Sequence, residues 1–351
     1  MKVVIATTQV PFTRGGAETH AEELRANFAR RGHEVDIISI PFKWYPSRTL
    51  VDCMIMGRLM DLTEMNGEKI DLLVALKFPA YYTAHPNKVI WLLHQHRQAY
   101  DLWGTQFGDL HQWPDGQRVR ELITRSDRLL LAEARAIFTN SRNVSKRLSQ
   151  YNNLESRPLY HPPPHHDKLY CAGYEPFIFY PSRIDAMKRQ RVLVEAARYL
   201  ASDVRIVVAG GSGARETEHL REIIALHHLE ARVELTGYIS EEQKRDYYAR
   251  CAAVYFGGYD EDYGYVPLEA MFSRKPVITH PDAGGALEFV MHEVTGLVVD
   301  SEPRKVAEAI DRLVHQPNLA AEYGEAGLKS IKSRDINWDF VIDQLIGAGR
   351  G

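Results

Sequence analysis

The chain has 351 residues, of which 45% are hydrophobic and 25% charged, and its formal net charge is −3. Such a composition is typical of a folded globular protein, and at roughly 100–200 residues per domain the length predicts two domains. Residues 1–160 hold 21 Lys and Arg against 17 Asp and Glu, an excess too small to indicate a nucleic-acid partner.

Compartment and redox state follow from two simple features. The chain opens with MKVVIATT, an apolar strand pattern without a secretory signal, and no apolar run is long enough to span a membrane, so we expect a cytoplasmic protein. Cys53, Cys171 and Cys251 are too widely spaced for a CxxC or zinc pattern. We expect them to act as small apolar side chains.

Short β-branched runs alternate with helical patterns in the first half of the chain. They lie at residues 2–8, 34–40, 69–77, 88–94 and 136–141. Continuous apolar runs are typical of parallel strands buried on both faces, and the intervening helices supply the crossovers. We therefore predict a Rossmann-like, doubly wound α/β domain over residues 1–165.

The pattern breaks at residues 157–176, where three consecutive prolines forbid a helix, and we place the linker there. Strand patterns then restart at residues 177–183, 205–211, 232–237, 252–258, 275–280 and 296–300. A second doubly wound sheet is expected over residues 166–333, with a last helix at about 334–351 that packs back on the first domain. Because open α/β sheets bind ligands at the carboxyl ends of their strands, the two domains are expected to face each other across the binding cleft.

Candidate residues of the first half follow its strands. Gly15 and Gly16 lie between the first strand and its helix, where the backbone can approach a phosphate or a sugar closely. His94 ends the run KVIWLLH and could bond a sugar hydroxyl or help to accept a proton, with His96 and Arg97 as alternates. Each of these residues could equally be structural.

Histidines also cluster in the linker, at positions 161, 165 and 166. Their number resembles a metal site, but a segment held extended by prolines is poorly suited to bring three ligands to one ion. We therefore expect no metal there.

The second half contains a pair of cations after its first strand. Arg183 and Lys188 lie five residues apart in PSRIDAMKRQ, and two fixed cations at this edge could neutralise a leaving nucleoside diphosphate. Two surface cations that flank a helix are the alternative. Gly211, in RIVVAGGSG, offers another close approach of the backbone, although neither glycine run is a complete GxGxxG.

The stretch DEDYGYVPLE, residues 260–269, allows two interpretations. Asp260 and Asp262 have the spacing of a divalent-metal clamp, whereas Glu261 and Glu269 would form a metal-free clamp for the sugar and the ribose. Pro267 suits the first position of a helix, which would place Glu269 in its first turn. The amides of Gly264, Tyr265 and Val266 would then face an anion that approaches the helix start.

These motifs together resemble the family-four retaining glycosyltransferases of the GT-B fold, the glycosyl transferases group 1. The resemblance rests on Gly15-Gly16-Ala17-Glu18, Arg183-x4-Lys188, Glu261-x7-Glu269 and AGGALEF at 283–289. It departs from the family at Ser273-Arg274-Lys275 and at Tyr160–Pro163, so contacts from the latter junction are not carried over.

The resemblance implies that a sugar is transferred from a nucleotide-diphosphate donor with retention at the anomeric carbon. Glu261 would then contact the donor sugar, Glu269 the ribose, and Arg183 and Lys188 the diphosphate. His94 would lie near the sugar. Gly15 and Gly16 would lie near the donor phosphate and the acceptor, and the backbone of residues 282–285, including Gly284 and Gly285, would cradle the sugar.

The family also implies a metal-independent, front-face reaction in which a phosphate oxygen takes the proton of the acceptor hydroxyl. The donor would be GDP-mannose or a UDP-hexose, and the acceptor a glycan, a glycolipid or a small molecule. A nucleotide-sugar epimerase and a non-catalytic nucleotide-sugar-binding protein are the alternatives. Residues 41–48, PFKWYPSR, either touch the inner face of the cell membrane or form a packed loop.

Overall fold

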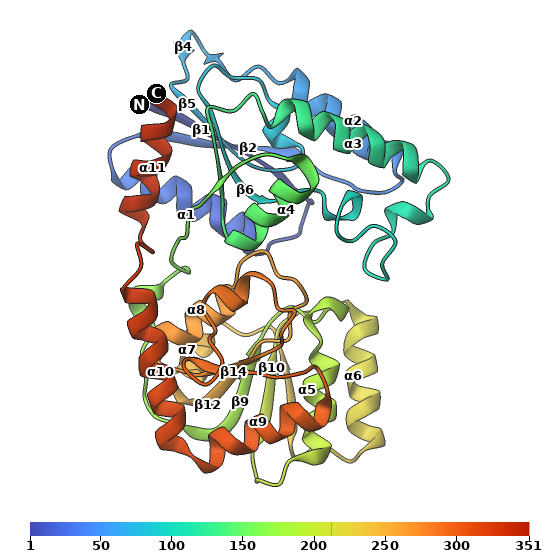
Figure 1. Cartoon of the computed structure of the whole chain (residues 1–351), viewed down its shortest axis with the longest axis vertical. Helices are drawn as coiled ribbons and strands as arrows, with labels where there is room; N and C mark the ends of the chain where they lie inside the picture. Colours follow the sequence, from blue (N-terminus) through green and yellow to red (C-terminus); the bar gives the residue numbers. More distant parts are fainter. Residues whose placement is uncertain (212, 351) are drawn as a thin grey trace. The chain divides into compact units, whose positions relative to one another are not determined.

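The computed structural model describes residues 1–211 and 213–350, which form two compact units (Figure 1). The first unit comprises Met1–Pro164 and the chain from Ile336 onward, and the second comprises His165–Asp335. The corresponding boundaries predicted from the sequence are residues 165 and 333. No helix of the described residues has the length and apolar character needed to cross a bilayer.

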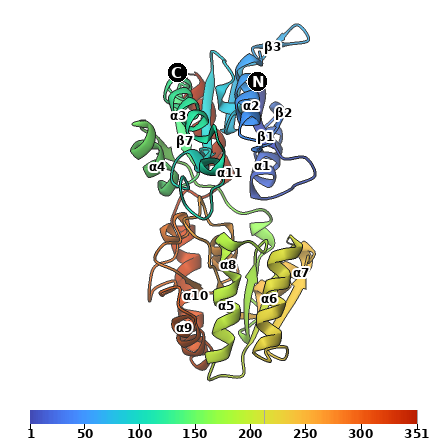
Figure 2. The same cartoon turned by 90° about the vertical axis from the view of Figure 1, so that its right-hand side faces the viewer.

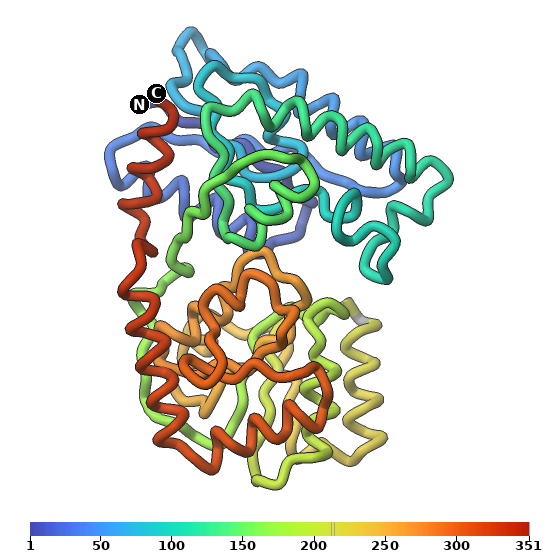
Figure 3. Tube along the Cα trace, in the orientation of Figure 1, coloured from blue at the N-terminus to red at the C-terminus, as the bar shows by residue number. Residues whose placement is uncertain are grey.

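The first unit contains a sheet of six parallel strands. Their order is β2 (Glu34–Pro41), β1 (Lys2–Gln9), β5 (Leu72–Lys77), β6 (Lys88–His94), β7 (Ala136–Thr139) and β8 (Arg157–Pro158). Two helices cover one face, namely α1 (Gly16–Arg30) and α11 (Trp338–Arg350), and they enclose a core that includes Ile5, Phe28 and Trp91. Figure 3 traces the last segment of the chain back beside the amino terminus.

The other face of this sheet carries a second core, with Ala6, Leu50 and Val119 among its members. It is covered by α2 (Arg48–Leu59), α3 (Gly116–Leu130) and α4 (Arg142–Asn152), together with the 3-10 turns η1 (Ala80–Tyr82), η2 (Arg97–Ala99) and η3 (Leu110–Gln112). A small antiparallel hairpin, β3 (Glu64–Met65) with β4 (Glu68–Lys69), turns at Asn66 and Gly67, whose positive φ angles suit a two-residue hairpin loop.

The second unit repeats the doubly wound arrangement with six parallel strands. Their order is β11 (Val233–Gly237), β10 (Arg205–Ala209), β9 (Glu175–Pro181), β12 (Cys251–Tyr255), β13 (Val277–Thr279) and β14 (Gly296–Val298). Its helices are α5 (Gln190–Ala196), α6 (Ala214–Leu226), α7 (Glu241–Arg250), α8 (Tyr265–Phe272), α9 (Pro303–His315) and α10 (Pro317–Lys332). Four 3-10 turns complete it: η4 (His166–Lys168), η5 (Ala186–Lys188), η6 (Ala197–Tyr199) and η7 (Gly285–Glu288).

The predicted fold class is confirmed, since all eleven predicted strands form and both six-stranded sheets are parallel. Strands β9, β10 and β12 of the second unit are buried along most of their length, which explains their continuous apolar runs. Strand β8 and the hairpin were not predicted, because two-residue strands leave no periodic signal. The three cysteines are free thiols, and Cys53 and Cys251 are buried.

Candidate active site

Two glycines after strand β12 allow the loop that carries Glu261 to lie against the η5 turn. A Cβ added at Gly257 would lie 2.6 Å from the carbonyl oxygen of Lys188, and one added at Gly258 would lie 2.5 Å from Cγ of Glu261. Any side chain at either position would push the loop away. From the sequence, this pair was interpreted only as the end of a strand. The carbonyl group that excludes a side chain at Gly257 belongs to Lys188, 69 residues earlier in the chain.

The same packing brings Lys188 and Glu261 together. The Nζ atom of Lys188 lies 2.5 Å from Oε1 of Glu261, and each side chain is 22% exposed. The Tyr180 hydroxyl donates to the carbonyl oxygen of Lys188 at 2.6 Å and thereby holds the turn on strand β9. Two residues that the sequence analysis selected in separate motifs therefore form one ion pair.

The Glu261 loop is also joined to the 282–285 loop by backbone hydrogen bonds. The N–H groups of Asp260 and Glu261 donate to the carbonyl oxygens of Asp282 and Ala283 at 2.8 and 3.3 Å, and the Gly285 N–H donates to the Glu261 carbonyl at 2.7 Å. A Cβ at Gly285 would lie 2.7 Å from the Asp262 carbonyl oxygen. The structure thus places two predicted segments side by side.

Gly284 and Gly264 occupy the two bends of this region. Gly284 has a φ of 64°, a conformation that favours glycine, and it precedes η7. Gly264 is the N-cap of α8, where an added Cβ would lie 3.3 Å from Cα of Ala286. A side chain at position 264 would therefore crowd the neighbouring η7 turn of the same unit.

Helix α8 begins differently from the prediction. Tyr265 is its first residue, so Pro267 is the third and Glu269 lies in the second turn rather than in the first. The first-turn N–H groups of any helix have no intrahelical partner, and a proline is therefore tolerated beyond the first position. Glu269 is therefore too far from the helix start for the first-turn interaction with the helix dipole.

Glu269 is instead held by helix α7. The residue is only 5% exposed. Its two carboxylate oxygens accept hydrogen bonds from Lys244 Nζ at 3.0 Å and from the Tyr248 hydroxyl at 2.7 Å. Burial disfavours the charge of Lys244, but Glu269 and Glu241 outweigh it and raise the lysine pKa. Lys244 and Tyr248 were missed, although their spacing of four residues places them on one helix face.

Arg183 follows strand β9 and remains accessible. Its side chain is 67% exposed, and its guanidinium lies 3.5 Å from a carboxylate oxygen of Asp185. Gly211 accepts a hydrogen bond from the Ile184 N–H at 3.2 Å, which ties the β10 loop to the Arg183 loop. The steric need for glycine is greater at Gly210, where an added Cβ would lie 2.1 Å from the Ser182 carbonyl oxygen.

A second ion pair, not predicted, links the η5 turn to the 282–285 loop. The Arg189 guanidinium donates to both carboxylate oxygens of Asp282, at 2.7 and 2.6 Å, and lies 5.1 Å above the ring centre of Tyr259. The arginine lowers the pKa of Asp282, whereas partial burial opposes this effect. Arg189 follows Lys188 directly, so both cations of the turn are engaged with acidic residues of neighbouring loops.

In the first unit, the residues before helix α1 and at the ends of β5 and β6 lie together. The Gly15 N–H donates to Glu18 at 2.9 Å, and the other carboxylate oxygen of Glu18 lies 3.1 Å from Lys77 Nζ. Lys77 is the register partner of His94, whose Nδ1 lies 2.7 Å from the carbonyl oxygen of Gln95 and therefore carries the proton. Gly16 is the first residue of α1, so its N–H is among the open amides of that helix end.

The two alternates to His94 have structural roles. His96 is buried beside Phe78, and burial lowers its pKa to about 3, so it is neutral and belongs to the core. Arg97 donates to Asp101 at 2.6 and 2.8 Å. Of these three residues, His94 at the end of β6 is the one that stays a site candidate.

The linker histidines do not form a cluster. His161 is buried in the first unit, where its Nε2 lies 2.9 Å from Nδ1 of His20, whereas His166 packs on Phe272 in the second unit. Among residues 1–211 and 213–350, no three His, Cys, Asp or Glu side chains converge as metal ligands, at Asp260 and Asp262 or elsewhere.

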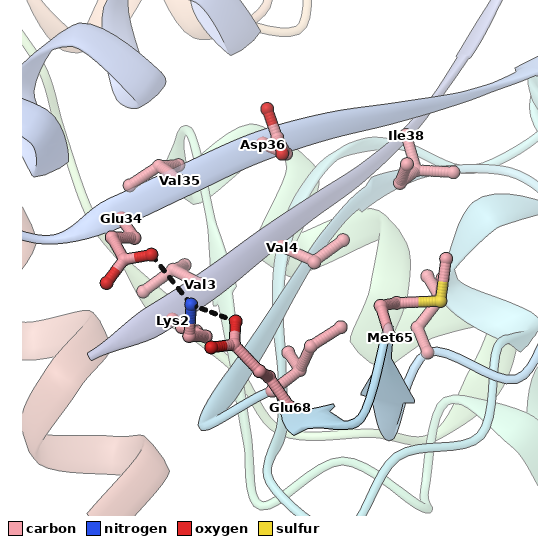
Figure 4. A pocket seen from close by; sticks show the side chains of 11 residues that line it. Lys2, Val3, Val4, Glu34, Val35, Asp36, Ile38, Met65 and Glu68 are labelled. Atoms are coloured by element: carbon pink, nitrogen blue, oxygen red, sulfur yellow. Dashed lines mark hydrogen bonds and ion pairs between the residues drawn. The ribbon is translucent and has the colours of Figure 1, made fainter.

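A cavity of about 220 Å³ lies apart from these candidates, at the amino-terminal ends of β1 and β2 and beside the hairpin. Figure 4 shows Lys2 between Glu34 and Glu68, with Nζ to oxygen distances of 2.7 and 2.5 Å. The predicted residues instead follow the carboxyl ends of their strands, where α/β sheets bind ligands. We therefore place the candidate site at that edge of each sheet.

Comparisons with known proteins find relatives among the glycosyltransferases. Mouse (Mus musculus) alpha-1,3/1,6-mannosyltransferase ALG2 is 33% identical over 165 residues, which are 44% of this chain and 39% of ALG2. The GDP-mannose-dependent alpha-(1-6)-phosphatidylinositol monomannoside mannosyltransferase of Mycobacterium tuberculosis is 31% identical over 195 residues, 52% of this chain and 50% of that protein. The matched part of the chain thus spans half or less of these curated relatives.

The fold matches over nearly its whole length. Sucrose-phosphate synthase from Thermosynechococcus elongatus superimposes with a TM-score of 0.80 at 18% identity, covering 99% of this chain and 98% of that chain. The two α/β units therefore define the GT-B class of glycosyltransferase fold. Residues 165–330, nearly the whole of the second unit, match the family described as Glycosyl transferases group 1.

Proposed function

We propose that the protein is a retaining glycosyltransferase that moves a sugar from a nucleotide-diphosphate donor to a hydroxyl group of a glycan, a glycolipid or a small molecule. The observation that carries the proposal is the Lys188–Glu261 pair within a group 1 glycosyltransferase domain. The pair holds a cation and an acid at the carboxyl edge of the second sheet. Arg183, which follows strand β9, supplies a second cation.

The donor occupies the second unit in this proposal. The amides of Gly264, Tyr265 and Val266 precede or open helix α8 and favour a phosphate. Each carboxylate oxygen of Glu269 has a lone pair beyond the hydrogen bond that it already accepts, so the group can also accept from a ribose diol. Glu261 and the backbone at Gly284 and Gly285 contact the sugar.

The reaction is a front-face substitution without a metal ion. The acceptor oxygen forms its bond to the anomeric carbon on the face from which the diphosphate departs, and a phosphate oxygen takes the acceptor proton. The bond between the anomeric carbon and the phosphate oxygen breaks, and its electron pair leaves with the diphosphate. Arg183 and Lys188 neutralise the charge that accumulates there. By resemblance to the family, Gly15 and Gly16 serve the donor phosphate and the acceptor, and His94 serves the sugar.

Within the two donor classes we propose GDP-mannose first. Both relatives named above are mannosyltransferases, and one of them is GDP-mannose-dependent by name. UDP-hexoses are the other class to be tested. A thermal-shift screen of GDP, UDP and their sugars separates the classes, because a ligand that binds the folded state raises its melting temperature by mass action.

Two conservative substitutions test the roles of the acids. Glu269→Gln keeps the side-chain volume but removes the charge, so we expect nucleotide affinity to fall by about 10- to 100-fold, the loss of one charged hydrogen bond. Glu261→Gln is expected to lower the rate of transfer more than it weakens nucleotide binding. Transfer rates and nucleotide titrations measure the two effects, with Glu308→Gln on α9 as the control.

The same measurements discriminate the alternatives. An epimerase would convert the donor sugar without an acceptor, and a binding protein would bind the nucleotide and leave the sugar donor intact. Normal turnover in both acid variants would contradict the proposed site. Loss of transfer on treatment with a chelator would contradict the metal-independent reaction.

A further inference from the structure

Helices α2 and α3 present exposed apolar side chains to solvent. Ile55 and Leu59 on α2 are 50% and 77% exposed, and Leu122 and Leu129 on α3 are 39% and 61% exposed. Isolated exposed apolar side chains are common, but a group of them on two contacting helices needs a physical reason.

Arginines alternate with these side chains on α3. Arg118, Leu122, Arg125 and Leu129 follow one another at intervals of four, three and four residues, so they form a single stripe along the helix. Val119 and Ile123 lie buried on the opposite side, as does Asp127. The stripe is therefore both basic and apolar.

Arg118 and Arg125 are exposed and have no ion pair in the described part of the chain, whereas two nearby arginines, Arg58 and Arg120, have partners within the protein. Arg58 on α2 is paired with Glu133 at 2.8 Å, and Arg120 on α3 donates to the Ala99 carbonyl oxygen and stacks on Trp103. Arg118 and Arg125 thus keep their full charge available to a partner.

The two helices direct their exposed sides the same way. Both pack on the same face of the first sheet, in the core that contains Leu50, Met54, Val119 and Ile123. Figures 1 and 2 show them side by side over that face. We define the α2–α3 surface as Ile55, Leu59, Arg118, Leu122, Arg125 and Leu129.

We propose that the α2–α3 surface docks on an anionic lipid bilayer. Aliphatic side chains of an amphipathic helix enter the boundary between headgroups and acyl chains, and arginines extend their long stems so that the guanidinium stays among the phosphates. A second copy of the chain fits less well, because a symmetric contact of this surface with itself would oppose like charges. The inference concerns the first unit alone and does not depend on the proposed transferase activity.

Sedimentation with vesicles tests this proposal. We expect the protein to bind vesicles of phosphatidylglycerol mixed with phosphatidylcholine, and to bind phosphatidylcholine alone much more weakly. Each arginine near an anionic surface strengthens binding by about fivefold, so Arg118→Gln with Arg125→Gln should weaken it by about 25-fold. Leu122→Ser with Leu129→Ser should also weaken it, and high salt should release the wild-type protein.

The second unit provides matched controls on helix α6. Arg215→Gln with Arg221→Gln removes two exposed arginines, and Leu226→Ser removes a leucine that is 73% exposed. Both controls should bind vesicles like the wild-type protein. Absent or charge-independent vesicle binding would overturn the proposal, as would equal losses in the α6 controls. Concentration-dependent self-association that the Arg118 and Arg125 variant abolishes would assign the surface to a second copy instead.

Discussion

Asp127 illustrates how a single buried carboxyl can set a pH dependence. It is fully buried in the first unit and accepts hydrogen bonds from the hydroxyl groups of Tyr81, Tyr82 and Tyr100 at 3.1, 2.7 and 2.6 Å. Burial raises its pKa to about 6 from an ordinary 3.8, although the three hydroxyl groups act in the opposite direction. The folded state therefore binds the proton of Asp127 more tightly than the unfolded state does.

The sign of the effect on stability follows from this shift. Protonated Asp127 contributes to the free energy of unfolding, and this contribution is fully present below about pH 4. It is lost as the pH rises through 6. At 1.36 kcal/mol per pKa unit, the loss amounts to about 3 kcal/mol. Asp127→Asn cannot titrate, so the difference in unfolding free energy between wild type and variant should favour the wild type more at pH 4 than at pH 7. Urea unfolding across this range measures it, with exposed Asp36→Asn as the control. A difference that stays constant with pH would refute the assignment.

At the scale of elements, the Arg189–Asp282 pair positions the η5 turn against the 282–285 loop. Asp282 is 46% exposed, so the pair adds little to stability, in the range of about 0.2–1 kcal/mol that exposed pairs contribute. Its position next to Lys188 gives it another effect. A small displacement of a positioned charge can lower a reaction rate by up to about a hundredfold.

Arg189→Lys loses the bidentate hydrogen bonding to Asp282. We therefore expect it to lower kcat of the proposed transfer by about tenfold or more with little change in melting temperature. The exchange of Arg189→Asp with Asp282→Arg should recover part of that loss, which a merely structural role would not show. Arg312→Lys, in an exposed pair with Glu293, is the matched control. If kcat falls equally in the control and the Arg189 variant, the positioning role is wrong.

The success of sequence-based prediction also differs between elements. The long strands were predictable because both faces are buried. A local pattern is equally readable at the start of α7, where Ser240 and Gln243, three residues apart, form a capping box with hydrogen bonds of 2.9 and 3.1 Å. The start of α8 was predicted wrongly, because a proline permits several positions in a first turn.

Residues that act through contacts distant in sequence were the ones missed. Gly257 is required by the carbonyl of Lys188, and Arg189 is fixed by Asp282, 93 positions further along the chain. Neither requirement leaves a local pattern, whereas motifs at strand ends, such as Arg183 and Glu261, follow from topology alone.

At the scale of the whole molecule, the chain returns to its first unit after completing the second. Helix α11 contacts α1, β5 and β6, and Trp338, Val341, Ile342 and Leu345 are buried there. On the surface of the unit, Arg31 forms an ion pair with Asp343 of the helix, with Nη2 and Oδ1 2.6 Å apart. The first unit is thus built from both ends of the sequence, while the second is continuous.

Removal of the last helix should therefore affect the two units differently. A chain that ends at Asp335 loses the burial of four large apolar side chains, which at about 1.5–3 kcal/mol each amounts to about 6–12 kcal/mol. This loss is comparable to the whole stability of a typical domain, about 5–15 kcal/mol, so the first unit should unfold. The second unit contains its own core and should stay folded.

Hydrogen exchange with mass spectrometry should show fast exchange across β1, β5 and β6 but persistent protection in β9, β10 and β12. Ile342→Ala, a milder change, should only accelerate exchange in the first unit, and slow exchange there in the truncated chain would show that α11 is dispensable.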